Sequence, residues 1–397
     1  MAWPTHYYQM VGLVWAFRAA GHEVTVAGHP SVADAATKTG VIAVCAGGNY
    51  DYVEGIRSLV QSRKRLADEL NMGEHDPFPA SAFEKIHELR MGPHIKTAED
   101  LAEDLATFAR KWRPHLVIAD PMVYAAPIAA GVAGAPLVRH LWGPDMCRHI
   151  GLPGSGVDED DYRAVWPKGL IDLYAAYGVK PAADVAACTL DTCPASMQLP
   201  GTRNRIAMRY TAYNGVSEVP SWLLEPTERP RVCVTWGSVA TALLGSEAFL
   251  VPRILKALDG LGVDVVVAIR SADRERLGDV PDGMRVVESM PLDLILPTCS
   301  AIIHQSGAGT TLSAALFGVP QVTLPQVADQ GLVSAQLSGT GAGIGLAADE
   351  ADTNAIRDAT SRTLHTAEPR DAAARLREEI LAQPTPAKVI KALEELI

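Results

Sequence analysis

Short runs of β-branched and apolar residues alternate along this chain with longer segments in which apolar residues recur at helical spacing. This alternation is typical of parallel sheets built from right-handed crossover units, so an α/β fold is predicted. The predicted strands form two sets. The first set is 22–28, 40–46, 114–120, 136–142 and 205–211, and the second is 231–238, 263–270, 284–290, 300–305, 321–326 and 342–346.

Two strand sets predict two domains, which suits a chain of 397 residues, more than one ordinary hydrophobic core accommodates. Residues 217–230, SEVPSWLLEPTERP, contain three prolines and alternating charges and are the predicted linker. The domains would therefore span 1–216 and 231–382. The last segment, 383–397, has one apolar stripe at helical spacing behind a Thr-Pro start and is predicted to be a helix.

Two segments are less regular. Residues 47–97 contain GGNYDY, HDPFP and MGPH between two helical patterns, so a mobile lid or a partner-binding segment is expected there. The acidic run DEDD at 158–161 suggests either a metal site or, more simply, a solvated loop. We favour the loop.

Charge and composition exclude several classes of protein. A net charge of −11 does not suit a nucleic-acid binder, which needs a basic face. No apolar run reaches the ~20 residues of a membrane span, and the N-terminus does not resemble a signal peptide. The six cysteines are scattered through mainly apolar runs, which favours buried, reduced thiols and a cytoplasmic location.

One stretch suggests an anion site. HQSGAGTTLSAALFGVPQVTLPQVADQ, residues 304–330, reads as a strand, a small-residue turn, a helix and a second strand. Such a turn offers free backbone N–H groups and the positive end of a helix dipole, which together bind phosphate. Tight packing of a strand against a helix is the simpler explanation of the glycines. His304 alone is weak evidence for an anion site, because a histidine at the end of a strand is often only a core residue.

Asp329 and Gln330, which follow the next strand, strengthen the argument. Adjacent parallel strands end side by side, so this carboxylate and amide would line the same crevice as the phosphate donors. A carboxylate and an amide together suit sugar hydroxyls, which need both an acceptor and a donor. The pattern therefore favours a nucleotide sugar as the ligand.

Several segments of the chain resemble those of a known family. PTHYYQMVGLVWAFRAAGHEV (4–24), KWRPHLVIAD (111–120), RHLWGPD (139–145), RVCVTWGS (231–238) and QPTPAKV (383–389) are similar to segments of inverting GT-B glycosyltransferases of the UDP-glycosyltransferase superfamily. Within them, the similarity is to actinobacterial enzymes that transfer deoxysugars to antibiotics, such as the desosaminyltransferases. It extends over nearly the whole chain.

The resemblance implies two Rossmann-like domains that face each other across a cleft. The acceptor would bind in the first domain and the nucleotide sugar in the second, and the terminal helix would cross back to the first. The implied activity is transfer of a deoxysugar, dTDP-linked by expectation, to a hydroxyl of a hydrophobic polyketide-type acceptor. The resemblance also implies a homodimer and a haem-free helper of the cytochrome monooxygenase fold as partners.

The resemblance also assigns roles to residues. His6 matches the catalytic base and Asp120 the acid that orients it. In the donor domain the matching residues are Trp236, Gly237 and Ser238 in a turn facing phosphates and acceptor, Met290 and Pro291 beside the pyrimidine base, His304, Ser306, Gly307, Gly309 and Thr310 in the diphosphate cradle, and Asp329 and Gln330 on the sugar hydroxyls.

The chemistry suits these residue types. Displacement at an anomeric carbon needs a base on the acceptor hydroxyl and a stabilised leaving diphosphate. A histidine with a carboxylate behind it supplies the base. Backbone N–H groups, a helix dipole and His304 would neutralise the diphosphate, so neither a metal nor another cofactor is expected.

Three departures from the family's pattern stand out. A strand normally precedes the His6 motif, and none is visible before Met1, so we expect that the first strand is missing from this sequence. Ser306 stands where glycine is usual; its hydroxyl either contacts phosphate or is simply tolerated. Gln305 replaces a common His or Asn.

Other interpretations stay open. His6 could simply pack a loop, Asp120 could cap a helix, and Trp236 could be ordinary packing. A catalytically silent binding protein of the same fold is one alternative function. A Rossmann oxidoreductase is another, although the chain lacks an early G-x-G-x-x-G unit.

Overall fold

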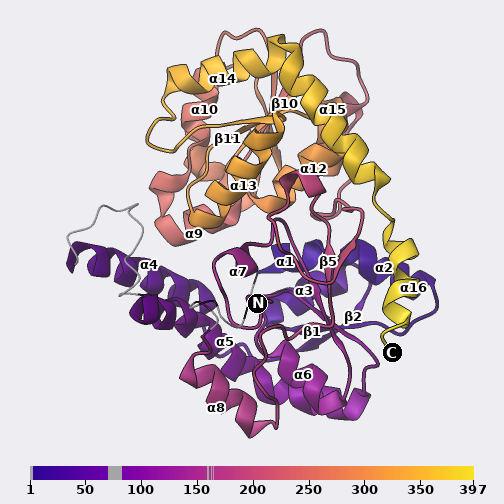
Figure 1. Cartoon of the computed structure of the whole chain (residues 1–397). Coiled ribbons are helices and arrows are strands. Elements are labelled where there is room, and N and C mark those ends of the chain that lie inside the picture. Colours follow the sequence, from indigo (N-terminus) through magenta and orange to yellow (C-terminus); the bar gives the residue numbers. More distant parts are fainter. Residues whose placement is uncertain (1–2, 70–82, 159–160, 162, 164) are drawn as a thin grey trace.

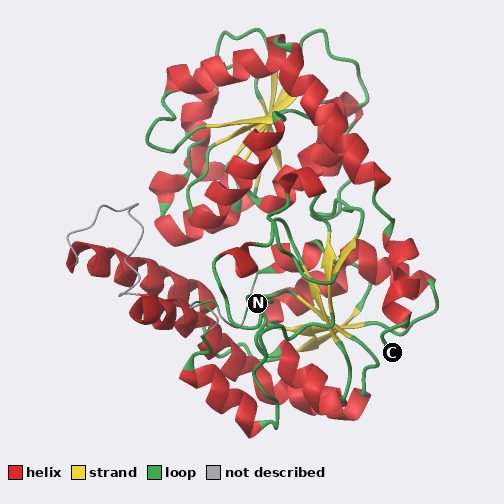
Figure 2. Ribbon diagram, viewed as in Figure 1, coloured by secondary structure: helices red, strands yellow, loops and turns green. Residues whose placement is uncertain are grey.

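The computed structural model describes residues 3–69, 83–158, 161, 163 and 165–397. It shows two α/β domains, with the N-terminal half in indigo and magenta below the C-terminal half in orange and yellow (Figure 1). In both domains the strands lie inside and the helices cover them (Figure 2). All strand pairs named below are parallel. The predicted fold class, two parallel-sheet domains, is confirmed.

The second domain is built on one six-stranded sheet in the order β12-β11-β10-β7-β8-β9. Its central strands are fully buried because helices cover both faces of the sheet. The strands are β7 Arg231–Thr235, β8 Asp264–Ile269, β9 Arg285–Glu288, β10 Ala301–His304, β11 Gln321–Thr323 and β12 Gly343–Gly345. The helices are α9 Ser238–Leu244, α10 Val251–Leu258, α11 Leu292–Ile295, α12 Ala308–Leu316, α13 Ala328–Thr340, α14 Thr353–His365 and α15 Ala367–Ala382.

The first domain has two separate sheets in the described residues, β1-β2 and β3-β4-β5-β6. The strands are β1 Thr25–Gly28, β2 Ile42–Cys45, β3 Val117–Ala119, β4 Leu137–His140, β5 Cys188–Asp191 and β6 Arg205–Ala207. The helices are α1 Pro4–Tyr8, α2 Val11–Ala19, α3 Pro30–Lys38, α4 Tyr52–Glu69, α5 Phe83–Trp112, α6 Ala126–Ala133, α7 Met146–His149 and α8 Lys168–Ala176.

The two sheets of the first domain are separated between β1 and β3, where the expected first strand would lie. No strand in the described part of the chain pairs with the second edge of either one. Most residues of β1 and β3 are only half-buried, whereas β4 and β5 are fully buried. One further parallel strand, paired with both open edges, would join the two sheets and cover these residues.

The sequence predicted every strand except β5. This strand is central and fully buried, yet it carries Thr189 and Asp191 and so does not look apolar. Arg205 and Gln198 donate hydrogen bonds to Asp191 Oδ2, at 2.5 and 2.8 Å, which compensates for burying the carboxylate. A paired charge in a core strand therefore concealed the strand from the hydrophobic pattern.

Residues 47–97 are more helical than expected, because most of their described part lies in α4 and α5. The segment HDPFP lies outside the described residues. MGPH does not interrupt a helix: Pro93 lies inside α5, and the hydroxyl of Thr97 donates a hydrogen bond to its carbonyl at 2.8 Å. The lid or partner-binding role predicted here stays a prediction.

The C-terminal helix α16 (Pro386–Glu394) packs on the first domain. Val389, Ile390 and Leu393 share a buried cluster with Leu13 and Phe17 of α2. A second cluster joins the domains themselves, where Tyr210 and neighbouring side chains of the first domain pack on α12 and α15. The two domains are thus held together by apolar contacts in addition to the linker.

All six cysteines are free thiols, and Cys147, Cys188, Cys193 and Cys233 are buried, whereas Cys45 is exposed. Among the described helices, none combines the length and the apolar character that a membrane crossing requires.

Candidate active site

His6 and Asp120 meet at the carboxyl end of the first domain's sheet. His6 lies in α1, Asp120 directly follows β3, and Nδ1 of His6 is hydrogen bonded to Oδ2 of Asp120. The side chain of His6 is 19% exposed and that of Asp120 only 4%. The fold therefore joins the two residues that the sequence assigned to a base and its partner.

Electrostatics favour an ionised Asp120. Burial alone would raise the pKa of this carboxyl, but the charge and hydrogen bond of His6 and the N–H of Met122, 2.7 Å from Oδ1, bring it below its usual value. A carboxylate at Nδ1 places the ring proton there and leaves the lone pair of Nε2 free. The arrangement suits a base that accepts a proton at Nε2.

The predicted cradle lies where β10 leads into α12. Gly307 is the N-cap of α12 and no side chain caps it, so the N–H groups of the first turn have no side-chain acceptor. Gly307, Gly309 and Thr310 are each half-buried. Free N–H groups and the helix dipole make this turn suitable for an anion.

His304 contributes to this turn indirectly. Its ring is fully buried, Nδ1 accepts the N–H of Ser306 at 3.1 Å, and Nε2 donates to Oε1 of Gln321 at 2.9 Å. Burial lowers the pKa of His304 to about 4, so the ring is neutral. With both nitrogens occupied and no charge, the side chain holds Ser306 in place and offers no free donor to a diphosphate.

Ser306 and Gln305 each carry a buried oxygen without a hydrogen-bond partner in the described structure, Oγ and Oε1 respectively. Ser306 has φ +67°, in the left-handed region that favours glycine, which explains why glycine is usual at this position. A buried unpaired polar group costs about 1 to 3 kcal/mol. Both side chains are therefore candidates to contact a ligand or water at the turn.

Gly237, which precedes α9, faces Gln305. Its φ and ψ of −79° and 163° suit any residue, but a Cβ atom here would overlap the amide nitrogen of Gln305. A larger residue at position 237 would therefore force the Gln305 side chain to move. Ser238 begins α9 and is half-buried.

Trp236 points the other way: it lies in the core cluster, 3% exposed, and its Nε1 donates to the carbonyl of Ala248 at 2.8 Å.

Asp329 and Gln330 open α13 after β11. The side-chain oxygen of Gln330 already accepts the N–H of Gln326 at 2.9 Å, so its amide nitrogen is what it can offer a ligand. Burial raises the pKa of Asp329, and the charge of His6 acts in the opposite direction. His6 of the first domain and Asp329 of the second are therefore close enough to interact electrostatically across the domain boundary.

Met290 and Pro291, which were predicted to lie beside the pyrimidine of the nucleotide, follow β9. Pro291 is the N-cap of α11, and the N–H of Leu292 donates to Oδ1 of Asn214 at 3.1 Å. They lie at the carboxyl edge of the same sheet as the cradle. Met290 packs on a buried cluster of this domain, and its role beside the pyrimidine stays a prediction.

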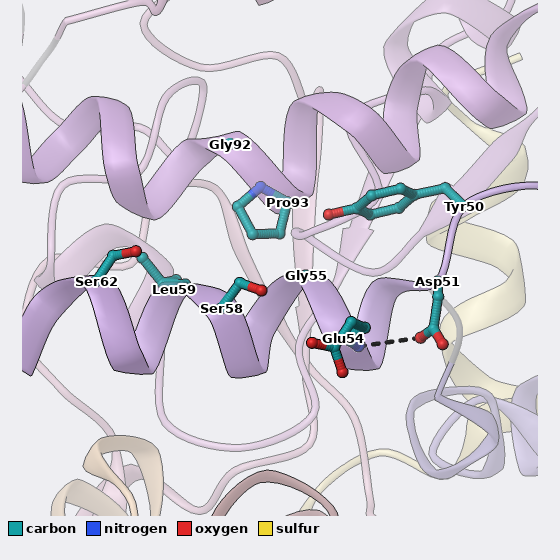
Figure 3. A pocket seen from close by; sticks show the side chains of 9 residues that line it. All are labelled: Tyr50, Asp51, Glu54, Gly55, Ser58, Leu59, Ser62, Gly92 and Pro93. Carbon is teal, nitrogen blue, oxygen red and sulfur yellow. Dashed lines mark hydrogen bonds between the residues drawn. The ribbon is translucent and has the colours of Figure 1, made fainter.

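A groove of about 450 Å³ lies between α4 and α5. Figure 3 shows it, with the phenol of Tyr50 directed toward Pro93 and the carboxylate of Asp51 capping the N–H of Glu54 at 3.0 Å. Its lining is Tyr50, Asp51, Glu54, Gly55, Ser58, Leu59, Ser62, Gly92 and Pro93. Tyr52, next to this lining, is buried and contacts Trp3, with ring centroids 6.3 Å apart. The groove is thus adjacent to the segment that carries His6.

The acidic run shows no metal cluster in its described part. Asp158 pairs with Arg203 and Arg148, and Asp161 pairs with Arg163. Residues 159 and 160 lie outside the described residues. In the part of the chain that the structure describes, no three His, Cys, Asp or Glu side chains group as metal ligands.

Two family models match almost the whole chain. The N-terminal domain model of the erythromycin biosynthesis protein CIII-like family matches residues 15–237, and its C-terminal domain model matches 252–396. The chain belongs to this family. The predicted resemblance to antibiotic deoxysugar transferases is confirmed, and with it the class of enzyme, a glycosyltransferase.

Individual relatives agree with the family assignment. The chain is 36% identical to 10-deoxymethynolide desosaminyltransferase of Streptomyces venezuelae, over 99% of this chain and 94% of that one. It is 33% identical to tylactone mycaminosyltransferase of Streptomyces fradiae, over 99% and 90%. The solved structure of the spinosyn rhamnosyltransferase SpnG with thymidine diphosphate has a TM-score of 0.80 and 28% identity, over 99% and 98%. The glycosyltransferase VinC with dTDP gives 0.79 and 29%, over 100% and 97%.

A side chain at position 237 would collide with the amide of Gln305. The methyl group of Gly237→Ala should displace the Gln305 amide and distort both turns, weakening thymidine diphosphate binding by about tenfold. Gly237→Ala/Gln305→Ala should recover most of that affinity, because the clash is gone. Isothermal titration of the two variants, the parent and Gln305→Ala measures the coupling.

Gly339→Ala is the matched control, since a Cβ atom at Gly339 of α13 meets nothing within 4 Å. It should bind thymidine diphosphate like the parent. A double variant as weak as Gly237→Ala alone would show that Gln305 is not what requires glycine at position 237.

Proposed function

We propose that this enzyme transfers a deoxysugar from a thymidine-diphosphate-linked donor to a hydroxyl group of a polyketide-type acceptor with inversion, and that His6 is the general base. The named relatives support the substrate classes: they include transferases whose names specify 10-deoxymethynolide and tylactone as acceptors. Structural neighbours bound to thymidine diphosphate support the nucleotide.

The proposal rests on the contact between the domains beside the His6–Asp120 pair. The ring of Trp142 lies 5.1 Å from that of His6, and a Cβ atom at the next residue, Gly143, would be 2.9 Å from the Cβ of Ala308 at the start of α12. Asp329 opens α13 at the same sheet edge as α12. An acceptor at His6 and a donor sugar at Asp329 would then share one reaction centre. The acceptor O–H proton passes to Nε2 of His6 as the oxygen bonds to the anomeric carbon. The bond from that carbon to the diphosphate breaks, and the electron pair leaves with the diphosphate at the cradle.

Two carboxylates and one helix turn support the reaction at His6. Asp120, ionised and buried, stabilises the imidazolium that forms on His6. Asp329 accepts hydrogen bonds from the donor sugar and fixes its orientation. The first turn of α12 receives the leaving diphosphate. The groove between α4 and α5 is the proposed approach for the acceptor. A homodimer and the haem-free helper stay predictions from the resemblance.

His6→Ala tests the base. Transfer should fall by about 10²- to 10⁴-fold, because the acceptor proton has no destination, whereas the affinity for thymidine diphosphate should stay near the parent's. Transfer is measured by chromatography of the glycosylated acceptor and affinity by titration.

His22→Ala is the control, since His22 is a partly exposed histidine of the same domain that contacts Glu394 and the ring of Phe17 and not Asp120. It should retain activity. An equal loss of transfer and of nucleotide affinity in His6→Ala would contradict a base in the acceptor domain. Intact transfer would remove His6 from the mechanism, and a chain that binds donor but never transfers would favour a silent binding protein.

Asp329→Ala tests the sugar site. If the carboxylate accepts a sugar hydroxyl, the complete nucleotide sugar should bind more weakly by about 1.5 to 3 kcal/mol, the scale of a hydrogen bond to a charged group, while thymidine diphosphate is barely affected. A deoxygenated sugar offers fewer hydroxyls, so the low end is expected. Isothermal titration with both ligands measures the difference.

Asp349→Ala serves as the comparison, because Asp349 is an exposed carboxylate in the same domain. Both ligands should bind it as they bind the parent. If Asp329→Ala loses both ligands to the same extent, the residue shapes the loop and does not hold the sugar.

We further propose that transfer needs no metal ion, since the N–H groups at the start of α12 provide the positive end for the diphosphate. Activity in EDTA should equal activity in buffer. Loss of activity in EDTA with recovery on adding magnesium or manganese would contradict this mechanism.

A further inference from the structure

Trp142 lies directly on His6. It belongs to the loop after β4, and its ring centroid is 5.1 Å from that of His6, with the planes at 50°. Asp120 holds the imidazole at Nδ1, so Trp142 and Asp120 contact different parts of the same ring. The His6 side chain is 19% exposed.

The loop that carries Trp142 is held in place by hydrogen bonds of Asp145, three residues further along the chain. The N–H of Asp145 donates to Oε1 of Gln198 at 2.7 Å, and Oδ1 of Asp145 accepts the N–H of Arg148 at 3.2 Å. Next to Trp142, Gly143 lies against the donor domain, since a Cβ atom there would be 2.9 Å from the Cβ of Ala308, the first residue of α12. Trp142 is therefore fixed between His6 and the start of the cradle helix.

The polar end of the indole does not explain this placement. Nε1 of Trp142 is buried and has no hydrogen-bond partner in the described structure. A tryptophan chosen only for packing normally finds a partner for this N–H. The contact that the ring does make is with the imidazole of His6.

We propose that Trp142 is a positioning residue for His6: it limits rotation of the imidazole, keeps Nε2 directed at the acceptor, and stabilises the imidazolium through its π face. The inference rests on the proposed role of His6 as base. An aromatic face attracts a cation within about 6 Å of its centroid. The effect grows as His6 takes the acceptor proton, so it favours the transition state over the ground state.

The experiment compares Trp142→Phe and Trp142→Leu, each in the parent and in His6→Ala. In the parent, Trp142→Leu should lower kcat by about 5- to 30-fold, because the aromatic face is lost. Trp142→Phe keeps an aromatic face and should remain within about threefold of the parent. Thymidine diphosphate should bind both variants as it binds the parent.

The His6→Ala background distinguishes action through His6 from any other role. There, Trp142→Leu should cause no further loss, since there is no imidazole to position. The pH profile of kcat/KM adds a second readout, in which Asp120 at Nδ1 of His6 and the charge of Asp329 act on the ring in parent and variant alike. The acidic limb should move to lower pH in Trp142→Leu, because the ring that favours the protonated form is absent.

Several results would overturn the inference. An equal loss from Trp142→Leu in the His6→Ala background would show that the indole acts elsewhere, and a Phe variant as poor as the Leu variant would show that the aromatic face is not what matters. If Trp142→Leu does not fold, Trp142→Met should show the same loss, and a fully active Met variant contradicts the proposal. Failure of the proposed function looks different: His6→Ala itself would then transfer sugar at the parent's rate.

Discussion

The contact between the start of α12 and the first domain is the constraint on which the site depends. Tyr210, which follows β6, donates its hydroxyl proton to the carbonyl of Gly309 at 3.1 Å and lies 3.0 Å from the hydroxyl of Ser313. These atoms belong to the helix whose first turn is the candidate diphosphate cradle. Gly143 touches Ala308 on the same helix. The candidate cradle is therefore positioned by the first domain as well as by its own sheet.

This constraint explains why the site can divide its tasks between two domains. His6 and Asp120 come from the first domain, whereas Asp329 and the cradle come from the second, and each set lies at the carboxyl edge of a parallel sheet. Reaction requires the acceptor oxygen and the anomeric carbon to lie near van der Waals contact. The apolar cluster around Tyr210 packs α12 on the first domain and so fixes the position of one sheet edge relative to the other.

The sequence predicted most of this arrangement because its signals are local. The strands of the second domain contain short runs of β-branched and apolar residues, as in β8 and β10, and the strand, small-residue turn and helix from His304 onward occur as expected. The roles of residues whose partners lie far away in the chain could not be predicted from the sequence. The buried Asp191 of β5 is compensated by Arg205, the ring of His304 is occupied by Gln321, and Trp236 turns into the core to meet the carbonyl of Ala248. Trp142 and Gln305 gain their significance only from neighbours far away in the chain.

A crystal structure of the protein with thymidine diphosphate bound tests the central claim most directly. The account predicts that the diphosphate oxygens accept hydrogen bonds from the N–H groups of residues 307–310 and from the hydroxyl of Ser306. The thymine would lie beside Met290. The terminal phosphate, to which the donor sugar is attached, would face Nε2 of His6. A diphosphate bound away from the first turn of α12, or on the side of that turn remote from His6, would contradict the account.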